Sequence, residues 1–100
     1  MMKPKNITIV EVGTRDGLQM EKSVVPTEKK ILLVNALTAA GVRRMEVTSF
    51  VSPKVLLQFS DAHEVMTSIR REPGGVYIAL VPNLKGAERA FAAGSDGVKI

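Results

Sequence analysis

Apolar residues along this chain follow two different spacings, one typical of strands and one typical of helices. Short runs rich in β-branched residues predict four strands, at residues 6–12, 44–48, 76–81 and 98–100. Between these runs apolar side chains recur at helical spacing, which predicts three helices, at residues 27–40, 60–71 and 84–93. Strands that alternate with helices predict an α/β fold, with a parallel sheet and right-handed crossovers.

The ends of the predicted helices carry residues that favour helix starts and stops. Thr27 is a suitable N-cap for the first helix, Ser60 for the second and Asn83 for the third. Gly41 and Gly94 follow the first and third helices, where a residue in the left-handed conformation can end them. No linker or low-complexity segment interrupts this order, so residues 1–100 are expected to form one structural unit.

Length and composition exclude several classes of protein. With 100 residues, of which 45% are hydrophobic, the chain can fold around one modest core. No apolar run approaches the ~18 residues of a membrane span, so we expect no membrane partner. The start of the chain lacks the features of a secretory signal or a transit peptide, which predicts a cytoplasmic location. The chain has no cysteine, which excludes disulfides and a cysteine nucleophile within these residues.

The basic residues of the chain are dispersed. The net charge is +4, but Lys29-Lys30, Arg43-Arg44 and Arg70-Arg71 lie far apart in the sequence. Nucleic-acid binders usually gather cations on one stripe and interleave aromatic residues. We therefore expect solvated cations and no nucleic-acid partner, whereas an anionic small molecule is compatible with this charge.

Unusual polar residues follow three of the predicted strands. They lie at Gly13–Gly17 after the first strand, at Glu46–Ser49 along the end of the second, and at Pro82-Asn83 after the third. Parallel strands bring their carboxyl ends to the same rim of the sheet, where the sites of βα proteins form. This convergence predicts a functional site at that rim.

Arg15 beside Asp16 has two interpretations. In one, the two residues form a charge pair on a tight turn, with Gly17 supplying a positive φ. In the other, Asp16 is an oxygen ligand for a hard divalent cation and Arg15 stabilises an oxyanion. If the cation engages Asp16, the guanidinium of Arg15 can face developing negative charge.

Glu46 is a charged residue in an otherwise apolar strand. Regular alternation puts it with Thr48 on the face opposite Val47. It either pairs with a cation across the sheet or points into a site, where it orients Arg15 or transfers a proton. Ser49 is compatible with a loop cap or with a hydrogen bond to substrate.

His63 is the single histidine and falls in the second predicted helix. A histidine without a partner on a helix is usually at the surface, so we expect it to face solvent and do not assign it as a metal ligand.

Three segments, in order along the chain, resemble the signatures of one family: EVGTRDGLQMEK (11–22), EVTSFVSPK (46–54) and VPNLKG (81–86). On these segments the chain resembles the hydroxymethylglutaryl-CoA lyase family of metal-dependent enzymes. The resemblance implies the N-terminal part of a TIM (β/α)8 barrel, a pyruvate carboxyltransferase-like domain truncated at about strand four. A whole barrel takes ~250 residues, so the later strands, with the family's His-x-His ligands and catalytic cysteine, lie outside these residues.

The resemblance also implies an activity, a cofactor and site residues. The reaction is the cleavage of 3-hydroxy-3-methylglutaryl-CoA to acetyl-CoA and acetoacetate, with a divalent cation, Mg or Mn, as cofactor. Arg15 and Glu46 match catalytic residues of the family, and Asp16 matches a metal ligand. Substrate contacts are expected from Arg15, Gln19 and Ser49.

Some residues depart from the family pattern and leave alternatives open. Thr14, Met20 and residues 55–57 differ from the usual family residues, which is compatible with a lyase acting on a related hydroxyacyl-CoA. A non-catalytic remnant is a second alternative, and a flavodoxin-like binding domain is a third, although Gly13 and Gly17 do not make a convincing phosphate loop.

A partial barrel leaves strand edges open. We therefore expect the chain to associate, either with a second copy of itself or with a complementing C-terminal chain. The acyl-CoA is expected to be the substrate of the whole barrel, and the isolated chain is expected to be inactive.

Overall fold

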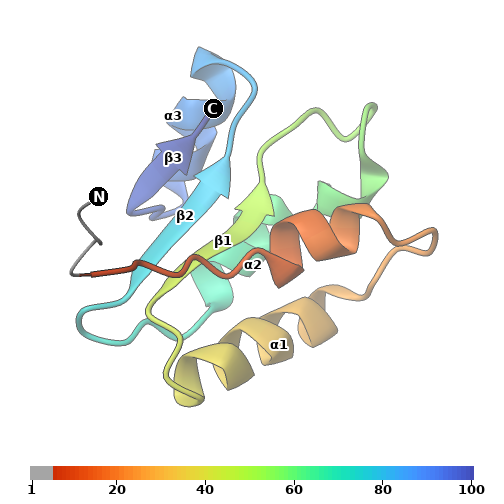
Figure 1. Ribbon diagram of the computed structural model, residues 1–100. Helices are drawn as coiled ribbons and strands as arrows, with labels where there is room; N and C mark the ends of the chain where they lie inside the picture. Colours follow the sequence, from red (N-terminus) through yellow and green to blue (C-terminus); the bar gives the residue numbers. More distant parts are fainter. Residues whose placement is uncertain (1–5) are drawn as a thin grey trace, which may run out of the picture.

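Helices and strands alternate in the computed structural model, which describes residues 6–100 (Figure 1). The strands are β1 (Arg44–Ser49), β2 (Val76–Leu80) and β3 (Gly97–Lys99), and the helices are α1 (Thr27–Ala39), α2 (Ala62–Ser68) and α3 (Leu84–Ala92). A π-helix at Gly13–Gly17 and a 3-10 helix at Leu57–Phe59 are the shorter elements. The strands are parallel in the order β1-β2-β3, which confirms the predicted α/β class and parallel sheet.

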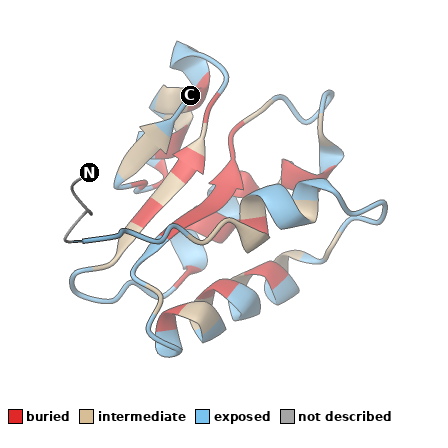
Figure 2. Cartoon of the chain, in the orientation of Figure 1, coloured by how far each residue is buried: buried red, intermediate tan, exposed pale blue. Residues whose placement is uncertain are grey.

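The hydrophobic core lies between the sheet and the helices (Figure 2). Helix α2 packs on β1, α3 packs on β3, and α1 packs on α2. Tyr77 and Ala79 of β2 face this core and are at most 1% exposed. The alternate residues Ile78 and Leu80 are only partly buried, because they point to the other face of the sheet. No α-helix among residues 6–100 covers this face, and only the π-helix packs on it, at β1 (Figure 1).

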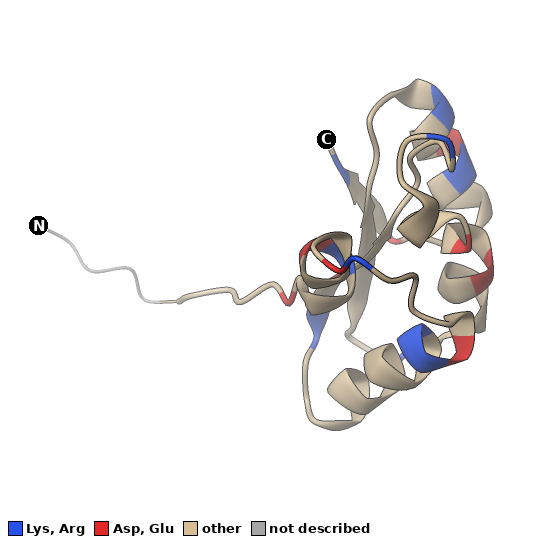
Figure 3. Cartoon of the chain, turned by 90° about the vertical axis from the view of Figure 1, so that its right-hand side faces the viewer, with Lys and Arg blue, Asp and Glu red and all other residues tan. Residues whose placement is uncertain are grey.

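The strand predicted at residues 6–12 is wrong: this segment makes only an isolated parallel bridge, between Glu11 and Met45. The Glu11 N–H donates to the carbonyl of Arg44 at 3.0 Å, and the Glu11 carbonyl accepts from the N–H of Glu46 at 2.9 Å. Residues 6–10 extend away from the rest of the chain and are exposed (Figure 3). A strand needs a ladder of hydrogen-bond partners, and no described strand pairs with residues 6–10.

Two of the predicted helix starts are also wrong. Thr27 lies inside α1, whose N-cap is Pro26, and its hydroxyl donates to Asp61 Oδ2 at 2.7 Å. Ser60 is not the cap of α2, because this helix begins at Ala62 after Asp61. Both hydroxyl residues have cap-like sequence positions, but contacts between α1 and the start of α2 decide the local geometry.

The predicted cap of α3 and the two predicted glycine stops are confirmed, whereas α2 ends at Ser68, three residues before the predicted end at residue 71. The Asn83 side chain caps α3 by accepting a hydrogen bond from the backbone N–H of Gly86 at 2.9 Å. Gly41 and Gly94 have φ values of 105° and 90°, so a residue in the left-handed region follows both α1 and α3.

A buried lysine joins α1 to the segment before α2. The ammonium of Lys30, a residue that is 3% exposed, lies 2.8 Å from Asp61 Oδ1 and also donates to the carbonyl of Gln58. The Gln58 side chain accepts from the N–H of Val25 and donates to the carbonyl of Ser23, both at 2.9 Å. These bonds hold the loop that follows the π-helix against the body of the molecule.

Charged residues are spread over the helices, with Lys and Arg interspersed among Asp and Glu (Figure 3). None of the helices among residues 6–100 is both long enough and apolar enough to cross a membrane.

Candidate active site

The site begins in the turn that follows Val12. The carbonyl oxygen of Val12 accepts three successive backbone N–H groups, those of Arg15, Asp16 and Gly17, at 3.1, 2.7 and 3.2 Å. The last of these bonds closes the wide turn of the π-helix Gly13–Gly17. Single π-helical turns are rare in proteins, and those that occur are often at functional sites. The backbone conformation of Gly13–Gly17 is therefore compatible with a functional site at this segment.

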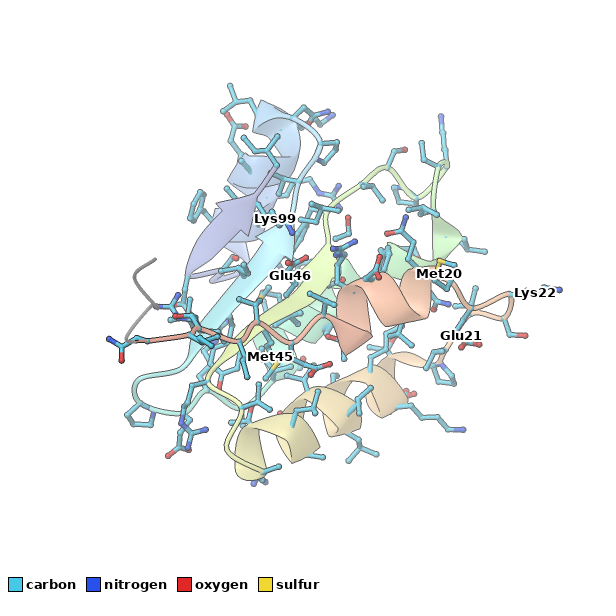
Figure 4. The ribbon with its side chains drawn as sticks, in the orientation of Figure 1. Met20, Glu21, Lys22, Met45, Glu46 and Lys99 are labelled. Atoms are coloured by element: carbon cyan, nitrogen blue, oxygen red, sulfur yellow. The ribbon has the colours of Figure 1, made fainter. Side chains whose placement is uncertain are left out.

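Glu46 connects three parts of the chain. The buried Thr14 donates its hydroxyl to the main-chain carbonyl of Glu46 at 3.2 Å, which ties the π-helix to β1. The Glu46 side chain is 3% exposed, and its Oε1 accepts from Arg15 Nε at 2.8 Å while its Oε2 accepts from Lys99 Nζ at 3.2 Å. Figure 4 shows Glu46 and Lys99 close together. A buried carboxylate thus has a cation on each oxygen, the pairing that makes its burial tolerable.

A bulge in β1 decides which side chains accompany Glu46. Glu46 lies opposite Ile78 and Ser49 lies opposite Leu80, with Val47 as the extra residue between them. Because Ile78 and Leu80 are two residues apart, Glu46 and Ser49 share the open face of the sheet. Lys99 also lies opposite Leu80, from β3, and so belongs to the same face.

The same bulge corrects the predicted position of Thr48. Regular alternation puts Thr48 beside Glu46, whereas the structure pairs it with Ala79, on the core face. Ser49 takes its place on the open face. The Ser49 Oγ is the one buried side-chain polar atom without a hydrogen-bond partner among the described residues. Buried hydroxyls are normally paired, so this one lacks a local structural explanation.

The structure brings together some of the predicted site residues and leaves others apart. Arg15 and Glu46 are in direct contact, and Asp16 Oδ1 lies 3.3 Å from Arg15 Nη1 with its side chain 59% exposed. Gln19 is exposed at the end of the π-helix, and the following loop extends away from Glu46 (Figure 4). His63 is exposed on α2, as expected.

The two local interpretations of these charges both have a counterpart in the structure. The Arg15–Asp16 pair predicted for a tight turn is present, but Gly17 lies in the π-helix and does not have the expected positive φ. Glu46 pairs with a cation across the sheet, Lys99, and at the same time with Arg15. The carboxylate is therefore bound by both kinds of partner that the sequence allowed.

Lys99 is the residue of this cluster that the sequence analysis did not single out. The available signal was a charged residue between Val98 and Ile100, in an otherwise apolar strand end, the same signal that marked Glu46. What was missing was the register of β3, because sequence alone does not say which residue of β3 stands beside Leu80.

The residues described here do not by themselves form a metal site. No group of three or more His, Cys, Asp or Glu among residues 6–100 is arranged to hold a metal ion. Asp16 has the oxygen donors that a hard cation prefers and is accessible, but it is a single ligand.

Comparison with known proteins identifies the family to which the residues of this site belong. The HMGL-like family model matches residues 6–100, which includes the π-helix, Glu46 and Lys99. The chain belongs to the HMGL-like family. This assignment confirms the resemblance identified from the sequence segments.

The curated relatives of this HMGL-like chain are lyases by name. Mitochondrial hydroxymethylglutaryl-CoA lyase of Rattus norvegicus is 53% identical over 97 residues, which are 97% of this chain and 30% of the relative. The cytoplasmic 3-hydroxy-3-methylglutaryl-CoA lyase of Mus musculus is 50% identical over 97 residues, or 97% of this chain and 28% of that protein. The chain therefore spans about a third or less of the length of the relatives it matches.

Solved structures of the same family share the fold. The hydroxymethylglutaryl-CoA lyase of Pseudomonas aeruginosa matches with a TM-score of 0.90 and 50% identity, covering 95% of this chain and 32% of that enzyme. An HMG-CoA lyase of Acinetobacter baumannii, solved in complex with coenzyme A and 3-methylmalate, matches with a TM-score of 0.89 and 45% identity, covering 98% and 32%. The fold of this chain is thus one part of the TIM barrel of these lyases.

Proposed function

We propose that this chain forms the N-terminal part of a hydroxymethylglutaryl-CoA lyase, which cleaves 3-hydroxy-3-methylglutaryl-CoA to acetyl-CoA and acetoacetate. The observation that carries the proposal is the contact of Arg15 with the buried carboxylate of Glu46 at the strand-end rim of an HMGL-like chain. The lyase names of the relatives support the reaction class. A cytoplasmic location is part of the same proposal.

The reaction requires stabilisation of an anion that develops on the acetyl-CoA fragment. The substrate hydroxyl loses its proton, its oxygen becomes the ketone oxygen of acetoacetate, and the carbon–carbon bond breaks. The electron pair of that bond passes to the acetyl-CoA fragment as an enolate, which then takes up a proton. A fixed positive charge near the enolate oxygen lowers the energy of this step.

Arg15 is the residue to which we assign this role. Its Nε is held by Glu46 and its Nη1 by Asp16, while its Nη2 has no hydrogen-bond acceptor among residues 6–100. A guanidinium fixed along two edges keeps its third edge in a defined direction, so it can meet the enolate oxygen with little reorganisation. Glu46 acts in this proposal as the orienting carboxylate of Arg15.

We assign Asp16 as one ligand of a divalent cation, Mg or Mn, whose other ligands lie outside this chain. Such a cation supplies an electrophilic centre that favours loss of the substrate hydroxyl proton. Gln19 and Ser49 are proposed substrate contacts: the buried, unpaired Ser49 hydroxyl supports the second of these, and only sequence position supports the first.

The test uses a completed barrel, in which residues 1–100 are followed by the part of the Pseudomonas aeruginosa enzyme that this chain does not cover. We expect this protein to release acetoacetate from 3-hydroxy-3-methylglutaryl-CoA. Arg15→Ala in the completed barrel is expected to lower kcat by about 100-fold, ~3 kcal/mol, as for the loss of one oxyanion donor. Steady-state kinetics with acetoacetate detection measure this loss.

Two measurements separate the roles of Arg15 and Asp16. Titration with Mn²⁺ is expected to give similar affinity in the unsubstituted barrel and in Arg15→Ala, and weaker affinity in Asp16→Ala. Turnover by Arg15→Ala at the rate of the unsubstituted protein would exclude Arg15 from the mechanism. Turnover of another hydroxyacyl-CoA in preference would favour a related substrate, for which Thr14 and Met20 are the departures nearest to the site residues.

A further inference from the structure

The carboxylate of Glu46 has two partners, and the second does not belong to the Arg-Asp-Gly segment. Lys99 Nζ lies 3.2 Å from Glu46 Oε2, across a separation of 53 residues, and comes from the last strand of the sheet. The Lys99 side chain is 53% exposed, so its position follows from this ion pair and from the register of β3 rather than from surrounding packing.

A carboxylate held at one oxygen can still turn about its terminal torsion. That torsion is broad in glutamate, because it joins a tetrahedral carbon to a planar group. Arg15 Nε is the donor that holds Oε1 of Glu46. Lys99 Nζ, which donates to Oε2, restricts the rotation of the carboxylate about this torsion. The plane of the carboxylate in turn directs the guanidinium, since Arg15 Nε donates to it along one edge.

We propose that Lys99 is a positioning residue that acts through Glu46: it fixes the carboxylate so that Glu46 holds Arg15 with its remaining edge toward the site. This inference rests on the proposed function for its kinetic test. The charges support the same role, because the cluster has two cations and two carboxylates. Without Lys99, Glu46 and Asp16 would both depend on Arg15.

The kinetic test substitutes Lys99 in the completed barrel. Lys99→Met and Lys99→Gln are expected to lower kcat by about 10-fold with KM within about 2-fold, because the loss is in the transition state rather than in substrate binding. Lys99→Arg is expected to retain most of the activity, since it restores a charged donor that reaches Oε2, whereas the amide of Lys99→Gln is shorter and uncharged. Lys29→Met, at an exposed position on α1, is the matched control and is expected to leave kcat unchanged.

A double substitution tests whether Lys99 acts through Glu46. In a Glu46→Gln background, Lys99→Met is expected to change kcat by less than about 2-fold, because residues that act as a unit are not additive. A 10-fold loss in both backgrounds, or a rise in KM with kcat unchanged, would overturn the proposal and instead indicate a direct contact with substrate.

A spectroscopic readout keeps the proposal independent of activity. The Nε–Hε signal of Arg15, assigned by its absence in Arg15→Lys, is expected to exchange with solvent more rapidly in Lys99→Met and Lys99→Gln than in Lys99→Arg. Circular dichroism establishes that each variant is folded. An unchanged exchange rate of the Arg15 Nε–Hε proton would overturn the positioning role of Lys99, even if the completed barrel had no lyase activity. Faster exchange in a barrel without turnover would support the positioning role of Lys99 and reject the proposed function.

Discussion

The hydroxyl of Ser49 is buried at the C-terminal end of β1, an edge strand of the described sheet, yet no described group accepts or donates a hydrogen bond to it. A buried hydroxyl without a partner costs free energy, so its retention needs another reason. Ser49 shares the open face of the sheet with Glu46 and Lys99, which are opposite Ile78 and Leu80. Because Ser49 is fully buried here, a ligand can supply the missing partner only when the groups that cover this hydroxyl move aside.

Ser49→Ala in the completed barrel tests that reason. We expect the free energy of unfolding to rise by about 1–3 kcal/mol, because the substitution removes a buried hydroxyl without a partner and no internal hydrogen bond is lost. KM for 3-hydroxy-3-methylglutaryl-CoA is expected to rise by about 2- to 10-fold, the equivalent of one neutral hydrogen bond of ~0.5–1.5 kcal/mol. Urea unfolding and steady-state kinetics measure the two quantities.

The control is Ser68→Ala, at an exposed serine of α2, which is expected to change neither quantity. An unchanged KM in Ser49→Ala would remove this residue from the substrate contacts.

The residues of the candidate site were predictable where a polar side chain stood out from its surroundings in sequence. Arg15 and Glu46 were identified in this way, and their contact at 2.8 Å agrees with a shared site. Lys99 was not, because its role depends on the register of β3. Thr48 was assigned to the wrong face, since a bulge interrupts the alternation and leaves no mark in the pattern of apolar residues.

At the scale of elements, α3 approaches the sheet through a glycine. A Cβ added at Gly86 would lie 2.9 Å from the carbonyl oxygen of Phe50 and 3.0 Å from Pro82 Cδ. Both neighbours belong to the backbone or to a proline ring, so neither can move away easily. The close packing of α3 on the segment after β1 therefore requires the smallest residue.

Gly86→Ala is expected to destabilise the completed barrel by about 1–3 kcal/mol, as for overpacking of a core. Helix propensity alone predicts the opposite sign, because alanine favours a helix interior by roughly 1 kcal/mol over glycine. Thermal or urea unfolding decides between the two.

Gly17→Ala is the matched control, since a Cβ there meets nothing within 4 Å and the φ of Gly17 is not positive. It is expected to leave the unfolding free energy near that of the unsubstituted protein. Equal stability of the two variants would show that α3 can shift to accommodate the methyl group.

Most elements were predictable from periodicity, and the errors have a common cause. The boundaries of β1, β2, α1 and α3 agree with the sequence prediction within one or two residues. The segment 6–12 has the pattern of a strand but forms one bridge, because pairing requires a partner that local sequence does not supply. The predicted cap positions of Thr27 and Ser60 are wrong where two distant segments meet: Thr27 and Lys30 of α1 both bind the side chain of Asp61, the residue before α2.

At the scale of the whole molecule, one face of the sheet is covered among the described residues only by the π-helix, at β1. Three large apolar side chains near the two ends of the chain are largely exposed: Ile7 is 81%, Ile9 80% and Ile100 94% exposed. Exposed apolar side chains of this size often mark a contact surface. In relatives of about three times this length the matching region is one part of a barrel. These residues are therefore suited to contact with the remaining part of a barrel.

The 100-residue chain alone is expected to self-associate with increasing concentration and to release no acetoacetate. Added as a separate polypeptide, the C-terminal part of the Pseudomonas aeruginosa enzyme is expected to bind it, reduce self-association and restore turnover. Sedimentation velocity and acetoacetate assays measure these outcomes. Robust turnover by the chain alone, abolished by Asp16→Ala, would contradict the expectation that other segments must complete the site.

A pair of substitutions indicates which surface associates. Replacing Ile7 and Ile9 by lysine is expected to weaken self-association, whereas Leu32→Lys, at an exposed apolar residue of α1, is expected to leave it unchanged. Equal effects would indicate non-specific apolar association rather than a contact through the N-terminal segment 6–10.

The extra residue in β1, Val47, changes the side-chain direction of Phe50 as well as that of Ser49. In a strand of uniform pleat, the side chain of Phe50 would turn outward with that of Glu46, but the inserted Val47 reverses the phase so that Phe50 enters the interior instead. A single backbone irregularity thus sets both the candidate site residues at the rim and the packing of Phe50 in the core. A change that straightened this strand is therefore expected to alter the placement of Ser49 and the packing of the core together.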